Sequence, residues 1–135
     1  MATALRRRCG IGCEIVDLPH EDPYALELQI ARFWGDIDLR GVLFAGFSTM
    51  CNTFPRTLSL ARELKAAHPE VPIVLGGPES SANAGAILAA YPFIDFVVAG
   101  EAEPVLADLV ETLRRGGARG VLRGTAPNLD DVEAI

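Results

Sequence analysis

Aromatic residues and long apolar runs are scarce in this sequence. Phe, Trp and Tyr make up only 7% of its 135 residues while 50% are hydrophobic, so aliphatic side chains and alanine must fill the core. No apolar run approaches the roughly 20 residues that a membrane-spanning helix needs. No apolar stretch follows the arginines near the N-terminus, which argues against a secretory signal. We therefore expect one globular domain, located in the cytoplasm.

Positive charge and cysteine are also scarce. The chain has 12 Lys and Arg against 18 Asp and Glu, a net charge of −6, which argues against a nucleic acid or an anionic membrane as the main partner. The three cysteines, Cys9, Cys13 and Cys51, are an odd number and are expected to be reduced thiols. Cys9 and Cys13 have no histidine close by, and two thiolates are too few for a zinc or iron–sulfur site. We therefore predict no metal ligands.

Short aliphatic runs alternate with segments of helical period along the chain. Strands are predicted at residues 13–18, 41–47, 71–75 and 93–99, and helices at 22–35, 54–67, 80–90 and 104–115. This order predicts an α/β fold, a Rossmann-like (flavodoxin-like) doubly wound parallel sheet in a three-layer α/β/α arrangement. Ser80 or Ser81 is expected to cap the alanine-rich helix, and Asn52 or Thr53 the helix that begins at residue 54.

The two ends of the chain differ from this pattern. Residues 2–8 resemble the end of a helix, so the domain is expected to lack its first strand. We expect residues 1–117 to form the domain. Residues 118–135 would hold an edge strand at 121–123 and then a linker.

Three strand ends should meet at one edge of the sheet, where open α/β sheets bind ligands. These strand ends are residues 47–53, 76–78 and 100–103. The hydroxyl and amide groups of the first segment suit a neutral polar ligand or a phosphodiester, or serve only as helix caps. Gly76 and Gly77 either admit a ligand close to the backbone or form a tight turn. The residues alone leave both alternatives open.

Signatures of catalysis are missing. The chain has no GxGxxG and no GxxxxGK[ST] motif. The strand at 41–47 does not end in an aspartate, which a phospho-accepting receiver domain would need. Glu101 and Glu103 form a candidate carboxylate pair, but Glu103 precedes Pro104 and suits a helix N-terminus. With no activated nucleophile in view, the residues favour binding over catalysis, and a stand-alone enzyme is not expected.

The segment from Gly46 to Glu103 resembles the cobalamin-binding domain found at the N-terminus of many radical S-adenosylmethionine enzymes. The recurring parts are a strand ending in a Gly-x-Ser loop, the stretch HPEVPIVLGGP, and the stretch FIDFVVAGEAE. They stand in the family's order and spacing. The tail GVLRGTAPNLDDVEAI is similar to the linker that leads into the radical domain.

The resemblance implies a corrinoid pocket. Ser48-Thr49-Met50 matches the family's Ser-x-Leu element, with Met in place of Leu, and Gly76-Gly77 matches its Gly-Gly pair. The implied cofactor-binding residues are Ser48, Thr49, Met50, Cys51, Asn52, Thr53, Gly76, Gly77, Pro78, Gly100 and Glu101. No catalytic residue is implied.

Two family motifs are absent. The Asp-x-His-x-x-Gly motif is missing, and His20 is followed by Glu, Asp and Pro, so cobalamin would be bound without a histidine lower ligand. The CxxxCxxC motif is missing too, with Val16 where its third cysteine would stand. S-adenosylmethionine and an iron–sulfur cluster would therefore belong to a radical domain in cis or in trans.

The sequence thus predicts a cobalamin-binding module of a methyltransferase-like radical enzyme, which carries the corrinoid for a reaction centre supplied elsewhere. The alternative is a domain of the same fold that binds no corrinoid and serves as an interaction surface. An exposed sheet edge could also pair two copies of the chain into a homodimer.

Overall fold

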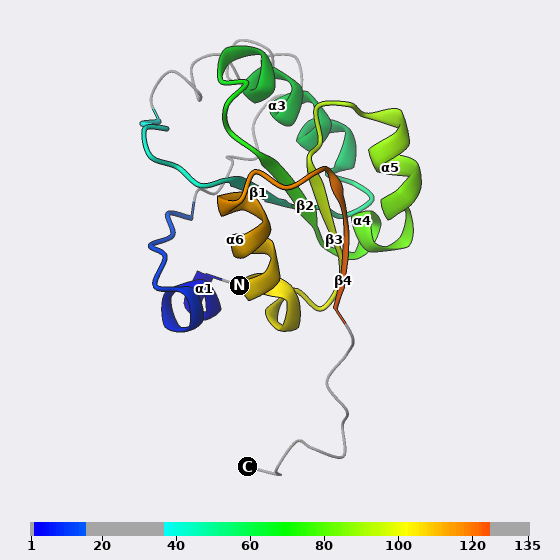
Figure 1. Ribbon diagram of the computed structural model, residues 1–135. Helices are drawn as coiled ribbons and strands as arrows, with labels where there is room; N and C mark the ends of the chain where they lie inside the picture. The colour runs from blue at the N-terminus through cyan, green and yellow to red at the C-terminus, as the bar shows by residue number, and fades with distance from the viewer. Residues whose placement is uncertain (1, 16–36, 125–135) are drawn as a thin grey trace, which may run out of the picture.

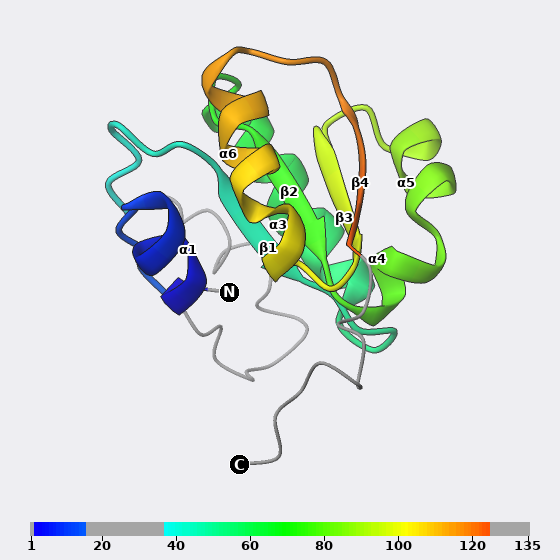
Figure 2. The ribbon, with the colours of Figure 1, turned by 60° about the horizontal axis from the view of Figure 1, so that its bottom comes forward.

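The computed structural model describes residues 2–15 and 37–124, and these form a parallel sheet with helices on both faces (Figures 1 and 2). The strands are β1 (Ala45–Ser48), β2 (Ile73–Gly76), β3 (Phe96–Gly100) and β4 (Gly120–Gly124). They lie in the order β1-β2-β3-β4, and every neighbouring pair is parallel. The predicted Rossmann-like α/β fold is confirmed.

Helices connect each strand from β1 onward to the next, as parallel pairing requires, and a further helix precedes β1. They are α1 (Ala2–Cys9), α3 (Phe54–Ala67), α4 (Pro78–Ala82), α5 (Ala84–Ala90) and α6 (Leu106–Arg114), and a 3-10 turn η2 (Glu103–Val105) precedes α6. Helix α1 confirms the helix predicted at residues 2–8. No helix in the described part of the chain is long and apolar enough to cross a membrane.

The core divides into clusters on the two faces of the sheet because successive strand residues point in opposite directions. The cluster under α3 and α5 contains Ala61, Leu64, Val71, Ile73, Leu75, Ala84, Ile87, Ile94, Val97 and Ala99. On the other face, Val74, Phe96 and Val98 pack with residues at the start of α6. Burial on both faces explains why the strands read as continuous aliphatic runs.

Helix α1 forms an outer layer on the α6 side (Figure 2). Leu5, which is 3% exposed, packs against Leu106 and Val110 of α6. The N-terminal segment thus covers apolar surface of α6 that would otherwise face water.

Helix α3 has the bounds predicted from the sequence. Pro55 lies in its first turn, Leu60 and Leu64 are fully buried, and His68 is its C-terminal cap. Helix α6 begins at Leu106, later than predicted, because residues 103–105 form the tighter η2 turn. It ends as predicted at Gly116 and Gly117, whose N–H groups bond Leu113 and Thr112 in a Schellman motif.

The prediction of one helix over residues 80–90 was wrong. Helix α4 begins at Pro78 and ends at Ala82, and α5 begins at Ala84. Asn83 separates them with non-helical backbone angles, and its side-chain amide donates to the Glu79 carbonyl at 3.3 Å. Ser80 and Ser81 lie inside α4 rather than at its cap, which is Gly77.

The strands differ from their predicted bounds by a few residues. Strand β1 begins at Ala45, whose N–H bonds Pro72 at 2.9 Å, and residues 41–44 precede the ladder. Strand β3 begins only at Phe96, and the predicted edge strand at 121–123 is observed as the slightly longer β4. A strand was predicted at residues 13–18, but residues 13–15 are not in a strand, and residues 16–18 lie outside the described residues. The helix predicted at residues 22–35 also lies outside them.

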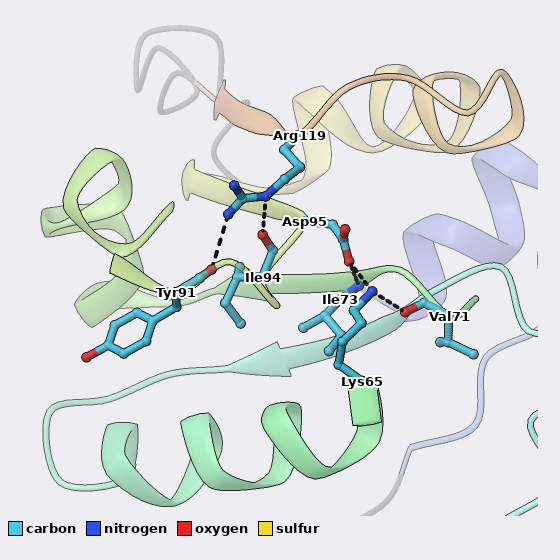
Figure 3. Close-up of polar contacts among 7 residues, drawn as sticks. All are labelled: Lys65, Val71, Ile73, Tyr91, Ile94, Asp95 and Arg119. Carbon is cyan, nitrogen blue, oxygen red and sulfur yellow. Dashed lines mark hydrogen bonds and ion pairs between the residues drawn. The ribbon is translucent and has the colours of Figure 1, made fainter. Parts of the chain in front are cut away.

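Two polar clusters join the elements at the amino ends of the strands (Figure 3). The Asp95 carboxylate accepts from Lys65 Nζ and from the Ile73 N–H, each at 2.8 Å. The Arg119 guanidinium donates to the carbonyls of Ile94 and Leu88 at 2.9 Å and of Tyr91 at 3.1 Å. These contacts fix loops at the edge formed by the amino ends of the strands. We call this edge, which lies opposite to the predicted ligand edge, the amino edge.

Candidate functional site

The carboxyl ends of β1, β2 and β3 lie at one edge of the sheet, as predicted. Ser48 pairs with Gly76 in the ladder between β1 and β2, and Gly100 pairs with Gly124 in the ladder between β3 and β4. The fold therefore brings residues 48–53, 76–78 and 100–101 to the same edge of the sheet. We call this set of segments the carboxyl edge.

Exposure alternates along the first of these segments. Ser48 is exposed, Thr49 is fully buried at 0%, and Met50 is 57% exposed. An exposed methionine is unusual for its residue type. The carboxyl edge thus presents the hydroxyl of Ser48 just before the buried threonine and the flexible apolar side chain of Met50 just after it.

Thr49 joins the end of β1 to the end of β2. Its N–H and its hydroxyl both lie 2.7 Å from the Gly76 carbonyl oxygen. The hydroxyl also accepts from the Ser80 N–H at 3.1 Å and lies 2.5 Å from the Ser80 hydroxyl. Ser80 is likewise 0% exposed. Thr49 therefore supplies the oxygen that caps the first turn of α4, whose own N-cap residue, Gly77, has no side chain.

Gly77 is required by this arrangement. Its φ of 100° and ψ of 174° lie in a region that is essentially restricted to glycine. A Cβ at this position would lie 2.5 Å from the Thr49 carbonyl oxygen and 2.7 Å from the Thr49 nitrogen. Of the two alternatives that the sequence left open for the Gly-Gly pair, close packing of the two loops accounts for Gly77 in full.

The rest of the first loop is organised around Thr53. Its hydroxyl accepts from the Met50 N–H at 3.2 Å and reaches the Met50 carbonyl at 3.3 Å. Thr53 is the N-cap residue of α3, as one of the predicted alternatives had it, but its side chain makes no capping hydrogen bond to the helix. Cys51 and Asn52 are exposed beside it.

Ser81 connects the second segment to the third. Its hydroxyl donates to the Gly77 carbonyl at 2.8 Å and accepts from the Gly100 N–H at 3.0 Å. Gly100 has a φ of 81°, and a Cβ there would meet the Gly124 carbonyl oxygen. The roles of Ser80 and Ser81 were missed in the sequence because one or the other was expected to be a helix cap; the signal available was two adjacent hydroxyl residues that follow a Gly-Gly-Pro turn after Glu79.

Other candidates do not gather into a catalytic or metal site. Glu101 and Glu103 are both exposed. His68 lies at the opposite edge, at the end of α3, with its Nδ1 3.4 Å from the Glu70 carboxylate. Among residues 2–15 and 37–124, no three His, Cys, Asp or Glu side chains are close enough to hold a metal ion.

A groove on another part of the surface is distinct from the carboxyl edge. It lies between α1 and α6 and is lined by Cys9, Ala107, Val110, Glu111, Arg114 and Arg115. Since α6 runs away from the carboxyl edge, the arginines that line the groove lie toward its far end.

The residues of the carboxyl edge fit a corrinoid. Its amide side chains and phosphodiester need hydrogen-bonding groups, which the exposed Ser48 and Asn52 supply. Its large macrocycle presents apolar surface, which Met50 can contact. Cysteine, histidine and carboxylate side chains are not needed for such a contact.

One comparison with known proteins shows the family of this chain. A family model of the B12-binding domain matches residues 1–110. No curated protein matches the chain. Among solved structures, the chain is similar to the N-terminal domain of the hypothetical protein TM0182 of Thermotoga maritima, with 16% identity, a TM-score of 0.49, and coverage of 83% of this chain and 100% of that one. Since the family model matches most of the chain, the resemblance to a cobalamin-binding domain is confirmed, and the protein belongs to the B12-binding domain family.

Proposed function

We propose that this chain binds cobalamin at the carboxyl edge and serves as the corrinoid-binding module of a radical S-adenosylmethionine methyltransferase-like enzyme. The family membership supports corrinoid binding, and the exposed Ser48 and Met50 beside the buried Thr49 are the observation that carries the choice of edge. When bound, the corrinoid would supply a cobalt centre that carries a methyl group. The chain's own residues would bind and orient it, and none would transfer a proton.

The lower face of the corrinoid would have no histidine ligand from the described residues. His68 is the one histidine among them, and it lies at the opposite edge of the sheet. We expect the remaining predicted residues, Cys51, Asn52, Thr53, Gly76, Pro78 and Glu101, to border the nucleotide tail. Residues 118–135 would lead from the domain through β4 to a radical domain, which would hold S-adenosylmethionine and an iron–sulfur cluster in cis or in trans.

The protein is proposed to act in the cytoplasm. Cys9, Cys13 and Cys51 are free thiols in the structure, which suits a reducing compartment. Strands β1 and β4 are the outer strands of the described sheet, and pairing of two copies through one of them would give the homodimer that the sequence suggests. Sizing the purified chain in solution tests that assembly.

The test is equilibrium dialysis against hydroxocobalamin, followed by desalting and a visible spectrum. We expect retained corrinoid with a base-off spectrum. Ser48→Trp should weaken binding by about tenfold or more, equivalent to about 1.4 kcal/mol, because the indole would fill the carboxyl edge. Ala66→Trp, at an exposed position near the far end of α3, is the control and should bind normally.

One observation favours the alternative function, an interaction domain that binds no corrinoid. Gly77 and Gly100 are both explained by close packing within the chain, so neither glycine requires a ligand. A folded sample that retains no corrinoid after desalting would support this alternative and reject the proposed function.

A further inference from the structure

We propose that Thr49 and Ser81 are positioning residues of the carboxyl edge: they fix its three loops relative to one another, and Thr49 does so without contacting the ligand. The inference rests on the proposed function for its ligand. Its structural part, the hydrogen-bond network itself, is independent of that function.

The Thr49 hydroxyl has no hydrogen-bonding capacity left for a ligand. The Gly76 carbonyl can only accept, so the Thr49 hydroxyl donates its single proton there. The hydroxyl must then accept from Ser80 twice, from the backbone N–H and from the side-chain hydroxyl. One donation and two acceptances saturate a hydroxyl group. A ligand could engage Thr49 only by breaking one of these buried bonds.

Ser81 continues the network toward β3. Its proton goes to the Gly77 carbonyl, and one lone pair accepts from the Gly100 N–H. The connection therefore runs from the end of β1 through α4 to the end of β3. It uses two adjacent serines, each bonded to a different strand end.

This network determines where the exposed residues stand. Ser48 and Met50 are the chain neighbours of Thr49, so the anchored threonine sets the position of both. Gly77 touches the Thr49 backbone, so the second loop follows the first. Loss of the Thr49 hydroxyl should therefore weaken corrinoid binding although the residue lies away from the ligand.

The experiment compares four variants of the full chain. Thr49→Val removes the hydroxyl at nearly constant shape, Thr49→Ser keeps it, and Ser81→Ala removes the bond to Gly100. Thr112→Val is the matched control, since its hydroxyl donates at 2.7 Å to the Asp108 carbonyl within α6. Affinity for hydroxocobalamin is measured by dialysis at a temperature where circular dichroism shows each variant folded, and amide hydrogen exchange is followed at Ser80 and Gly100.

The expected result is about tenfold weaker binding by Thr49→Val, which corresponds to the loss of about one hydrogen bond. Thr49→Ser and Thr112→Val should bind like the unsubstituted chain. Exchange should quicken at Ser80 in Thr49→Val and at Gly100 in Ser81→Ala. If Thr49→Val folds and binds with unchanged affinity, or if Thr49→Ser loses as much affinity, the inference is overturned.

Two outcomes separate this inference from the proposed function. If the unsubstituted chain fails to bind hydroxocobalamin, the proposed function fails, and the exchange data decide the network alone: unchanged exchange at Ser80 and Gly100 overturns it. If Thr49→Val does not fold, Ser81→Ala decides the inference, because the Ser81 side chain is only partly buried. Unchanged affinity and exchange in Ser81→Ala would then overturn it.

Discussion

The Thr49 hydroxyl lies 3.1 Å from the Ser80 backbone nitrogen, across 31 positions of sequence. It caps a helix that begins at a different strand from its own. Helix α4 has only five residues and would be marginal alone. The stability of α4 therefore depends on its contacts with the end of β1. These contacts join the loops that follow β1 and β2 into one structural unit.

Gly77→Ala tests this close approach. We expect a loss of more than about 1 kcal/mol in the free energy of unfolding, because alanine disfavours this backbone region and its Cβ would lie 2.5 Å from the Thr49 oxygen. Urea denaturation measures the loss. Gly85→Ala in α5, where a Cβ meets nothing within 4 Å, is the control and should stabilise by up to about 1 kcal/mol. Equal stability of both variants would contradict the structure at this loop.

Gly124→Ala tests the contact between the ends of β3 and β4. A Cβ on Gly124 would meet the Glu101 carbonyl oxygen, so we expect a loss of about 1–3 kcal/mol, as in other overpacked sites. Gly120→Ala lies on the same strand with its nearest neighbour 4.0 Å away and should change stability by less than about 0.5 kcal/mol. If thermal or urea unfolding ranks the two variants in the opposite order, the described end of β4 is wrong.

Arg119→Ala tests the hydrogen bonds that the Arg119 guanidinium makes at the amino edge (Figure 3). Three carbonyls would lose a charged donor, and we expect a loss of about 1–2 kcal/mol because the contacts are partly exposed. Arg119→Lys should recover only part of the lost stability, since one ammonium group cannot reproduce the planar set of donors of a guanidinium. Arg123→Ala, at an exposed position on β4, the strand that directly follows Arg119, is the control for lost charge. An equal loss of stability in Arg123→Ala would show that the change in net charge, rather than the Arg119 hydrogen bonds, is responsible.

Local patterns in the sequence predicted those elements whose causes are local. Helix α3 matched its predicted bounds because Pro55, the stripe of Leu60 and Leu64, and the stop at His68 and Pro69 all belong to the segment itself. The buried strands were recognisable for the same reason. Their ends moved by a few residues because the register with a neighbouring strand sets them, as the bond from Ala45 to Pro72 shows.

The carboxyl edge was only partly predictable. Parallel topology was enough to place the three loops together, but the direction of each side chain depends on distant partners. Thr49 was predicted as a cofactor contact because Ser48-Thr49-Met50 matches the family's Ser-x-Leu element; its partners within the chain, Gly76 and Ser80, could not be read from that motif. Ser81 was one of two residues expected at a helix cap, and its hydroxyl instead accepts from the Gly100 N–H. Such pairings follow from the assembled sheet: two hydroxyl residues after a turn can be seen in the sequence, but the strand ends that they bond cannot.

The most direct test of the central claim is an amide NMR map of the labelled chain, recorded before and after addition of hydroxocobalamin. We predict that the largest shifts fall on residues 48–53, 76–78 and 100–101, at the carboxyl edge. Arg119, Asp95 and the groove between α1 and α6 should shift little. Largest shifts at that groove or at the amino edge, or no shifts at a saturating concentration, would contradict corrinoid binding at the carboxyl edge.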